Sequence, residues 1–222
     1  MKGTEKRMKF YNLSRNIIAC DNFLNLQNVD EIFTDFLNNR NRFNVPSWGY
    51  TNEEKEKSVN DHQVITSKCG GLDFWIEWEN ATKENSFIGY LKNWFFSQGL
   101  YYYIGKDNYS VFQFLLDNTN RLFWNIHVVS YNNKGFYNWH KDLTPKNLFT
   151  FNLVLQKTKK LKGGNMLFMD ENKIIEVENK NNFMVVFPSF VPHAITPLYS
   201  ENNKDVSFLE QRFSIQFWVG LL

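Results

Sequence analysis

The stretch that decides the fold is the last apolar run of the chain, Arg212-Phe213-Ser214-Ile215-Gln216-Phe217-Trp218-Val219. Successive side chains of a β-strand point to opposite faces, so every second residue of this run shares a face. One face is entirely apolar and is expected to lie against the core: Phe213, Ile215, Phe217 and Val219. The other face carries Arg212, Ser214, Gln216 and Trp218. The sequence therefore predicts a closing strand with an apolar face and a mostly polar one.

Further short apolar runs precede this strand, and turn residues separate them. The runs are Leu122–Tyr131, Phe149–Leu155, Met166–Met169, Lys173–Val177 and Phe183–Phe187. The turn signals between them include Asn132-Asn133, Gly163-Gly164, Glu171-Asn172 and Asn179–Asn182. Many short strands at such spacing are typical of a β-sandwich or barrel, of which the jelly roll is one version.

The first 120 residues show a different pattern. Val29, Ile32, Phe33, Phe36 and Leu37 recur at helical spacing, so Asn28–Asn38 is expected to be an amphipathic helix. Further helices are expected at 87–95 and 109–118, with a short strand at Ser14–Cys20 and a loop at Thr51–Asn60. The predicted fold class is α+β, mainly β. It is a single domain over 1–222, in which a helix-rich part, 1–120, packs on one sheet of a double-stranded β-helix (jelly-roll) core, 121–222.

Composition excludes several classes of protein. The 222 residues suit one large domain, and 43% hydrophobic content with 18% aromatics excludes a disordered chain. Because Lys plus Arg is 25 and Asp plus Glu is 23, no basic excess favours a nucleic-acid partner. No apolar run is long enough to span a membrane, and no signal peptide opens the chain, so a cytoplasmic protein is expected. Cys20 and Cys69 allow one disulfide, but two free thiols are favoured.

Two of the four histidines form a candidate metal site with one aspartate. His140 and Asp142 are two residues apart, so on an extended chain both side chains point to the same face. His193 follows the apolar run 183–187, and Pro188 and Pro192 stiffen its approach. Two imidazoles and a carboxylate would form a facial triad, which suits non-haem Fe(II). Because His-x-acid spacing is common by chance, a hydrogen-bonded structural role is the alternative for each histidine.

The polar face of the closing strand offers a candidate anion site. An arginine among buried strands needs an anionic partner, and its planar fork binds a carboxylate through two hydrogen bonds. Ser214, on the same face as Arg212, can add a hydroxyl donor. The pair predicts a site for a dicarboxylate cosubstrate. The alternative is a surface arginine that pairs with Glu210.

Taken together, these motifs resemble the Fe(II)/2-oxoglutarate-dependent dioxygenases, and in detail the prolyl 4-hydroxylase-like branch. The motifs are Tyr131-x3-Gly135-x-Tyr137-x2-His140-x-Asp142, the hairpin Gly163-Gly164-Asn165-Met166-Leu167-Phe168, the distal His193, and Arg212-x-Ser214 on the last strand. Asn16–Leu24 is similar to the strand-to-helix opening of such proteins. The resemblance covers roughly the last 100 residues, whereas residues 40 to 120 carry none of these motifs.

The resemblance implies a set of cofactors and site residues. Iron would be held by His140, Asp142 and His193, and 2-oxoglutarate by Arg212 and Ser214, with O2 as oxidant and ascorbate as a possible support. Asn152 or Tyr131 would replace a tyrosine that some relatives use at the cosubstrate. The substrate pocket would include Tyr137, Trp139, Asn152 and Trp218, although core packing is the alternative for the aromatic residues.

The implied reaction is hydroxylation of an unactivated C–H bond. The substrate would be a prolyl residue of a protein or peptide, a free amino acid or another small molecule, and the sequence does not choose between them. The competing function is a non-catalytic, cupin-like metal- or ligand-binding module, which would need no arginine opposite the metal. His127 is expected to be a satisfied buried histidine, and Lys157–Lys162 a solvated turn.

Overall fold

The computed structural model describes residues 8–43, 71–76, 122–143 and 147–221. Several expectations fall outside these residues: the loop at 51–60, the helices at 87–95 and 109–118, and Cys69. Cys20 is a buried free thiol. Among the described residues, no helix has the length and apolar character needed to cross a membrane.

Most of the described chain forms two antiparallel sheets. The larger sheet has seven strands in the order β1-β2-β10-β6-β13-β4-β3. Their bounds are β1 Lys9–Asn12, β2 Ile18–Asp21, β3 Gly71–Ile76, β4 Leu122–Tyr131, β6 Asn147–Gln156, β10 Phe183–Pro188 and β13 Arg212–Leu221. The smaller sheet has the order β5-β11-β8-β9, with β5 Tyr137–His140, β8 Met166–Asp170, β9 Lys173–Val177 and β11 His193–Ile195. A third pair joins β7 Leu161–Gly163 to β12 Leu198–Ser200.

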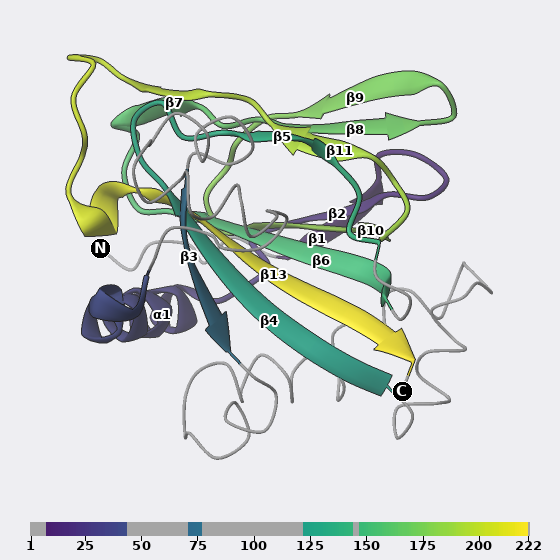
Figure 1. Ribbon diagram of the computed structural model, residues 1–222, viewed down its shortest axis with the longest axis horizontal. Coiled ribbons are helices and arrows are strands. Elements are labelled where there is room, and N and C mark those ends of the chain that lie inside the picture. Colours follow the sequence, from purple (N-terminus) through teal and green to yellow (C-terminus); the bar gives the residue numbers. More distant parts are fainter. Residues whose placement is uncertain (1–7, 44–70, 77–121, 144–146, 222) are drawn as a thin grey trace, which may run out of the picture.

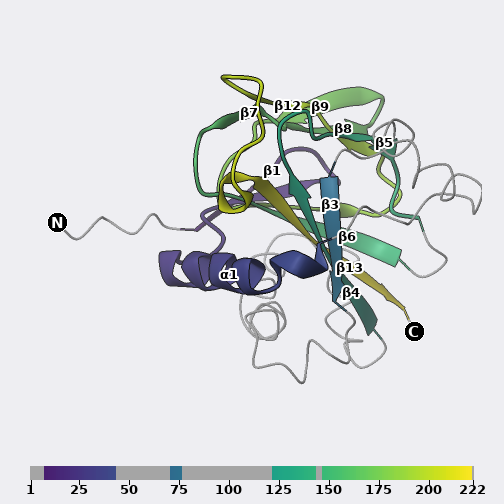
Figure 2. The ribbon, with the colours of Figure 1, turned by 60° about the vertical axis from the view of Figure 1, so that its left-hand side comes forward.

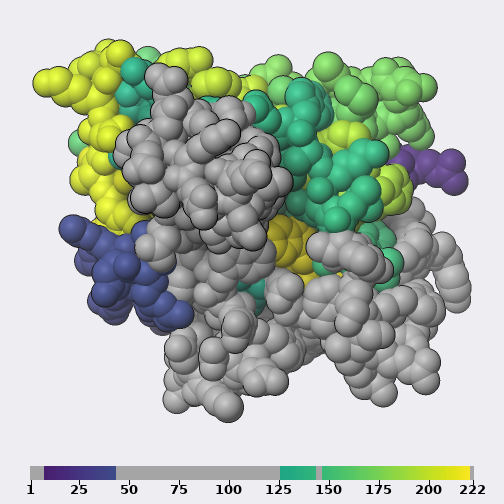
Figure 3. Space-filling model, viewed as in Figure 1, coloured from purple at the N-terminus to yellow at the C-terminus, as the bar shows by residue number. Residues whose placement is uncertain are grey.

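The elements are arranged in layers. The four-stranded sheet lies over one face of the seven-stranded sheet, and helix α1, Leu26–Asn38, lies against the other face (Figures 1 and 2). In the space-filling view, α1 and the β8–β9 hairpin occupy opposite corners of the molecule (Figure 3). Two short 3-10 turns, η1 Arg40–Arg42 and η4 Phe208–Glu210, complete the described elements. This layered antiparallel architecture is the predicted jelly roll.

Strand β13 has the two faces that its sequence predicts. Its alternate residues Phe213, Ile215, Phe217 and Val219 are buried in one hydrophobic cluster with α1. A second hydrophobic cluster lies between the two sheets and includes Val129 and Val154. Ser214, on the other face of β13, lies opposite Val129 on β4 and Val154 on β6. The polar face of the strand therefore looks into the space between the sheets.

Helix α1 forms because an apolar stripe and an N-terminal cap coincide. The Asn25 side chain accepts a hydrogen bond from the backbone N–H of Asn28 at 2.8 Å, which satisfies one of the free donors of the first turn. Val29, Ile32, Phe33 and Phe36 are buried against the sheet. The expectation that Leu37 shares this face is wrong, since it is 45% exposed. One helical step of 100° past Phe36 takes it to the flank of the stripe.

The predicted strands largely agree with the structure, with one correction. β4 and β9 have the predicted bounds, and β6, β8, β10 and β13 differ by one or two residues at their ends. The strand expected at Ser14–Cys20 begins only at Ile18, because Leu13 and Ser14 both donate backbone hydrogen bonds to the Ile17 carbonyl and close a turn. β1, β2 and β3 join the same sheet as the C-terminal strands, and the division of the chain near residue 120 stays a proposal.

Candidate metal centre and carboxylate site

Two strands of the smaller sheet bring the three candidate metal ligands together. His140 ends β5, His193 begins β11, and the two are register partners across the strand pair. Asp142 follows β5 by two residues. One ligand atom from each of the three residues lies within 4.8 Å of the others. The Nε2 atoms of His140 and His193 are 3.6 and 3.5 Å from the Asp142 carboxylate oxygens.

Both histidines are oriented in the same way. The Nδ1 of His140 lies 2.8 Å from the backbone carbonyl of Asn138, and the Nδ1 of His193 lies 3.0 Å from that of Val191. A carbonyl oxygen can only accept, so each Nδ1 donates this hydrogen bond, and in the neutral ring the lone pair is on Nε2. Both Nε2 atoms are buried and have no hydrogen-bond partner among the described residues. Two buried acceptors therefore face the same carboxylate, which is the arrangement that a metal ion would complete.

The third ligand is positioned from the larger sheet. Thr150, on β6, donates its hydroxyl to an Asp142 carboxylate oxygen at 2.6 Å. The Asn147 side chain donates to the Asp142 backbone carbonyl, and the Asp142 N–H donates to the Ser189 carbonyl at 3.0 Å. These bonds fix the segment after β5, so the carboxylate is held in place by both sheets.

The protonation state of the cluster suits a metal. Burial, and after it the nearby His193, lower the pKa of His140 to about 4, against the opposing effect of Asp142. The His140 ring is therefore neutral at pH 7, as a ligand must be. The Tyr137 ring stacks on His140, with centroids 3.7 Å apart. Two neutral imidazole nitrogens and one carboxylate form the donor set that non-haem Fe(II) prefers, so the residues fit the metal.

Arg212 is fully buried on the inner face of β13. Its Nη1 donates to Ser214 Oγ at 2.8 Å, and its Nε donates to the side chain of Asn179 at 3.2 Å. Nη2 has no hydrogen-bond partner among the described residues. Burial lowers the pKa of the guanidinium to about 10, so it is charged at neutral pH. A buried cation with an unused donor pair suits an anionic ligand.

The alternative role for Arg212 is wrong. Glu210, its expected surface partner, instead forms an ion pair with Lys160 and accepts a hydrogen bond from the Ser207 backbone at 3.3 Å. Tyr131 lies beside the arginine, with the Arg212 Cζ 5.3 Å from the centre of its ring. The candidate cosubstrate residues Arg212, Ser214 and Tyr131 are thus brought together.

A row of buried polar residues lies between Arg212 and the end of β13. Gln216 pairs in register with His127 on one side and with Asn152 on the other. The Nδ1 of His127 lies 3.0 Å from Gln216 Oε1, and its ring stacks on Trp218. His127 is therefore the satisfied buried histidine that the sequence predicts. Gln216 Nε2 and Asn152 Oδ1 have no hydrogen-bond partner among the described residues, so both can serve a ligand.

The candidate pocket residues differ in their surroundings. Tyr137 and Asn152 are buried, and Trp218 is half-buried on the inner face of β13. Trp139 is 43% exposed, so it is not part of the buried interior. Thr150, Asn179 and Ser189 also hold the site. Sequence reasoning did not find them, because a lone polar residue in a strand or turn gives no signal of a distant partner.

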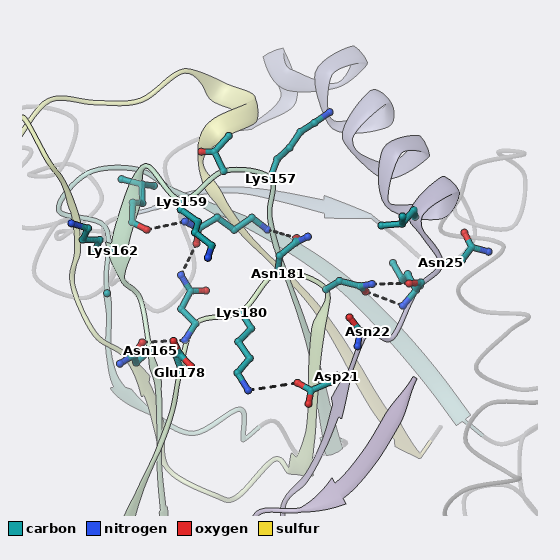
Figure 4. Close-up of a pocket in the computed structure, with 18 residues that line it drawn as sticks. Asp21, Asn22, Asn25, Lys157, Lys159, Lys162, Asn165, Glu178, Lys180 and Asn181 are labelled. Atoms are coloured by element: carbon teal, nitrogen blue, oxygen red, sulfur yellow. Dashed lines mark hydrogen bonds and ion pairs between the residues drawn. The ribbon is translucent and has the colours of Figure 1, made fainter. Parts of the chain in front are cut away.

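A polar cleft of about 1010 Å³ lies at the end of the sheets, between the β6–β7, β9–β10 and β2–α1 connections (Figure 4). The metal cluster and Arg212 do not line it. The expectation of a solvated turn at Lys157–Lys162 is only partly right, because Leu161 is buried and begins β7. The lysines of this segment are exposed; Lys157 and Lys162 line the cleft and form ion pairs with Asp30 and Glu201. Asn179, the partner of Arg212, lines the same cleft.

Comparison with known proteins identifies the part of the chain that carries this site. The model of the 2OG-Fe(II) oxygenase superfamily matches residues 126–220. No curated protein matches the chain by sequence.

Solved structures match the fold over most of the chain. A prolyl-4-hydroxylase from Pseudomonas putida is 15% identical with a TM-score of 0.59, covering 93% of each chain. A prolyl hydroxylase from Trichoplax adhaerens, in complex with a hypoxia inducible factor peptide fragment, is 17% identical with a TM-score of 0.63, covering 93% of this chain and 84% of that one. A viral collagen prolyl hydroxylase from Paramecium Bursaria Chlorella virus-1 is 12% identical with a TM-score of 0.52, covering 94% and 98%. At these identities the likeness shows a shared fold.

Proposed function

We propose that this chain is an oxygenase of the 2OG-Fe(II) superfamily, whose model matches residues 126–220, and that with Fe(II), 2-oxoglutarate and O2 it hydroxylates an unactivated C–H bond. The observation that carries the proposal is the pairing of two sites in one interior. Three ligand atoms converge within 4.8 Å, and a buried, charged Arg212 with an unused donor pair lies on the facing sheet. A metal-binding module alone would have no use for that arginine.

The side chains divide the work between them. His140, Asp142 and His193 would hold iron, with both histidine Nδ1 protons fixed on backbone carbonyls. Arg212 and Ser214 would bind the carboxylate of 2-oxoglutarate that lies farther from the metal, and Tyr131 would pack against it. Bound iron, with 2-oxoglutarate and O2, supplies the oxidising power for C–H hydroxylation. The burial of Arg212, Ser214 and Gln216 keeps bulk water from the cosubstrate.

We propose a prolyl residue of a peptide as the substrate. Three large apolar side chains are exposed within three residues of a metal ligand: Trp139, Leu143 and Phe190. The Asp142 N–H donates to Ser189, so the backbone before Phe190 lies close to the metal cluster. Exposed apolar side chains at the edge of a site favour a partner with a surface of its own over a small polar molecule. The structural relatives named above are prolyl hydroxylases, and one was solved with a peptide.

The test is succinate formation from 2-oxoglutarate, with Fe(II) and ascorbate, in the presence of prolyl peptides. We expect turnover that needs both metal and peptide and that disappears in His140→Ala. Lys141→Ala is the matched control, because Lys141 is exposed between two ligands and should leave turnover unchanged. Mass spectrometry of the peptide should show one added oxygen.

The controls separate the two halves of the proposal. If the same peptides with alanine in place of proline stimulate turnover equally, the prolyl assignment is wrong. Stimulation by free amino acids but by no peptide would move the substrate to a small molecule. Absence of iron-dependent turnover under every condition, with no binding of 2-oxoglutarate, would favour the non-catalytic module.

A further inference from the structure

Three consecutive hydrogen bonds fix the orientation of Arg212, and they run through the side-chain amides of Asn179 and Gln156. Arg212 Nε donates to Asn179 Oδ1 at 3.2 Å, Asn179 Nδ2 donates to Gln156 Oε1, and Gln156 Nε2 donates to the Leu161 carbonyl at 2.9 Å. The Leu161 carbonyl can only accept and the guanidinium can only donate. The guanidinium therefore requires the Asn179 amide oxygen to face it, and the Leu161 carbonyl requires the Gln156 amide nitrogen to face it. Neither side-chain amide can flip without losing one of these hydrogen bonds.

Asn179 is itself anchored, and the shaft of the arginine is confined. The backbone N–H of Asn179 donates to Asn165 Oδ1 at 3.1 Å, which ties the β9–β10 connection to the hairpin before β8. A Cβ at Gly164 would lie 3.0 Å from Arg212 Cδ, so the arginine lies directly against that glycine. Asn165 is seen in Figure 4 in the cleft that Asn179 also lines. The guanidinium is thus held at its stem and at Nε.

The Arg212 guanidinium is therefore held in one orientation, with one nitrogen left for a ligand. Nε and Nη1 are used by Asn179 and Ser214, and only Nη2 is without a partner among the described residues. We infer, on the basis of the proposed function, that Asn179 is a positioning residue that aims Arg212 at the far carboxylate of 2-oxoglutarate. Asn179 does not touch the cosubstrate. It acts through Arg212 and sets how strongly the site prefers a dicarboxylate to a monocarboxylate.

The test compares two ligands that differ only in the far carboxylate. Dissociation constants of 2-oxoglutarate and of 2-oxopentanoate are measured by calorimetry, with Mn(II) as a redox-inert metal. In Asn179→Ala, Nε loses its acceptor and the fork is free to turn. We expect 2-oxoglutarate to bind about tenfold more weakly, which is the size of one hydrogen bond to a charged group. Binding of 2-oxopentanoate should not change, because it makes no contact with Arg212.

A second variant tests the same contact with less change in packing, and a control variant tests a neighbouring residue. Asn179→Asp is nearly isosteric and places a carboxylate against the guanidinium, so it should also weaken 2-oxoglutarate selectively, even if the alanine variant folds poorly. Lys180→Ala changes the next residue of the same cleft, whose exposed ion pair is with Asp21, and should change neither constant.

The outcomes distinguish the inference from the function on which it rests. If wild type prefers 2-oxoglutarate but the Asn179 variants weaken both ligands equally, Asn179 is only structural and the inference is wrong. Unchanged binding of both ligands in the variants would also overturn it. If wild type itself shows no preference for 2-oxoglutarate over 2-oxopentanoate, then Arg212 is not the carboxylate site, and the proposed function fails first.

Discussion

The Asn182 side chain joins two elements that are far apart in the sequence. Its backbone has a φ of 56°, in the left-handed region, and its side chain bonds both backbone groups of Leu24, at 2.8 and 2.6 Å. It thereby ties the start of β10 to the entry of α1. Asn182→Ala should lower the free energy of unfolding by about 2–4 kcal/mol, because two buried bonds are lost and alanine disfavours that φ. Urea denaturation measures it.

The exposed Asn172 supplies the control for Asn182. It lies in the β8–β9 turn with a φ of 61°, so Asn172→Ala imposes the same backbone strain at the surface. Its cost should be about 1 kcal/mol. Equal costs for the two variants would mean that the contacts to Leu24 contribute nothing.

Cys20 should be unreactive in the folded protein. Burial raises the pKa of its thiol from 9.0 to about 12. At pH 8.5 the folded thiol is almost wholly protonated, whereas the unfolded thiol is partly ionised. Alkylation by iodoacetamide, followed by mass spectrometry of the Cys20 peptide, should be at least about 100-fold slower in native protein than in urea. Equal rates would contradict the burial of Cys20.

The raised pKa of Cys20 also predicts that the free energy of unfolding falls as pH rises from 9 toward 12, because in this range only the unfolded thiol ionises.

The turn at 179–182 shows why sequence predicts some site residues and misses others. The sequence predicts His140 and Asp142 from their spacing, and Arg212 from its place on the polar face of a strand. Asn179, Asn181 and Asn182 form one polar turn, yet they bond Arg212, the Gln156 backbone and Leu24 respectively. These partners lie 25 or more residues away, so no local pattern distinguishes the three asparagines.

At the scale of elements, long and alternating segments are the predictable ones. The sequence predicts β13 because apolar residues take every second position from Phe213 to Val219, and α1 because apolar residues recur at helical spacing from Val29 to Phe36. β5 and β11, which carry the two histidine ligands, have only four and three residues. Segments this short show no periodicity of their own. They pair because neighbouring strands supply the edges, so their existence depends on the assembled sheet.

Helix α1 allows a direct test of which face holds the molecule together. Phe36 packs against Phe213 and Phe43, with ring centroids 4.8 and 6.0 Å apart, whereas Leu37 is 45% exposed. Phe36→Ala should lower the free energy of unfolding by about 3–5 kcal/mol through loss of burial and the cavity left behind. Leu37→Ala should cost less than about 1 kcal/mol. Both are measured by urea unfolding. A large loss from Leu37→Ala would contradict the placement of the helix.

At the scale of the whole molecule, the site joins the two sheets. His140 and His193 lie on the four-stranded sheet, Thr150 holds Asp142 from the seven-stranded sheet, and Arg212 lies on that larger sheet as well. A metal ion alone would bind at one side of the interior. A metal with 2-oxoglutarate would connect one sheet to the other. Ligands of this kind bind only the folded chain, so they should raise its stability in proportion to their affinity.

Mn(II) and 2-oxoglutarate together should therefore raise the melting temperature by more than the sum of the increases that each causes alone. We expect Mn(II) alone to raise it, 2-oxoglutarate alone to change it little, and 2-oxoglutarate at a hundredfold excess over its dissociation constant to add about 2.7 kcal/mol of stability once Mn(II) is present. His193→Ala should abolish both increases. Arg212→Lys should keep the increase from the metal and lose most of the increase from 2-oxoglutarate, because a lysine keeps the charge but not the planar fork. A rise with 2-oxoglutarate that is equal in wild type and in His193→Ala would show that the cosubstrate does not bind at the metal, and the two sites would then have to be treated as independent.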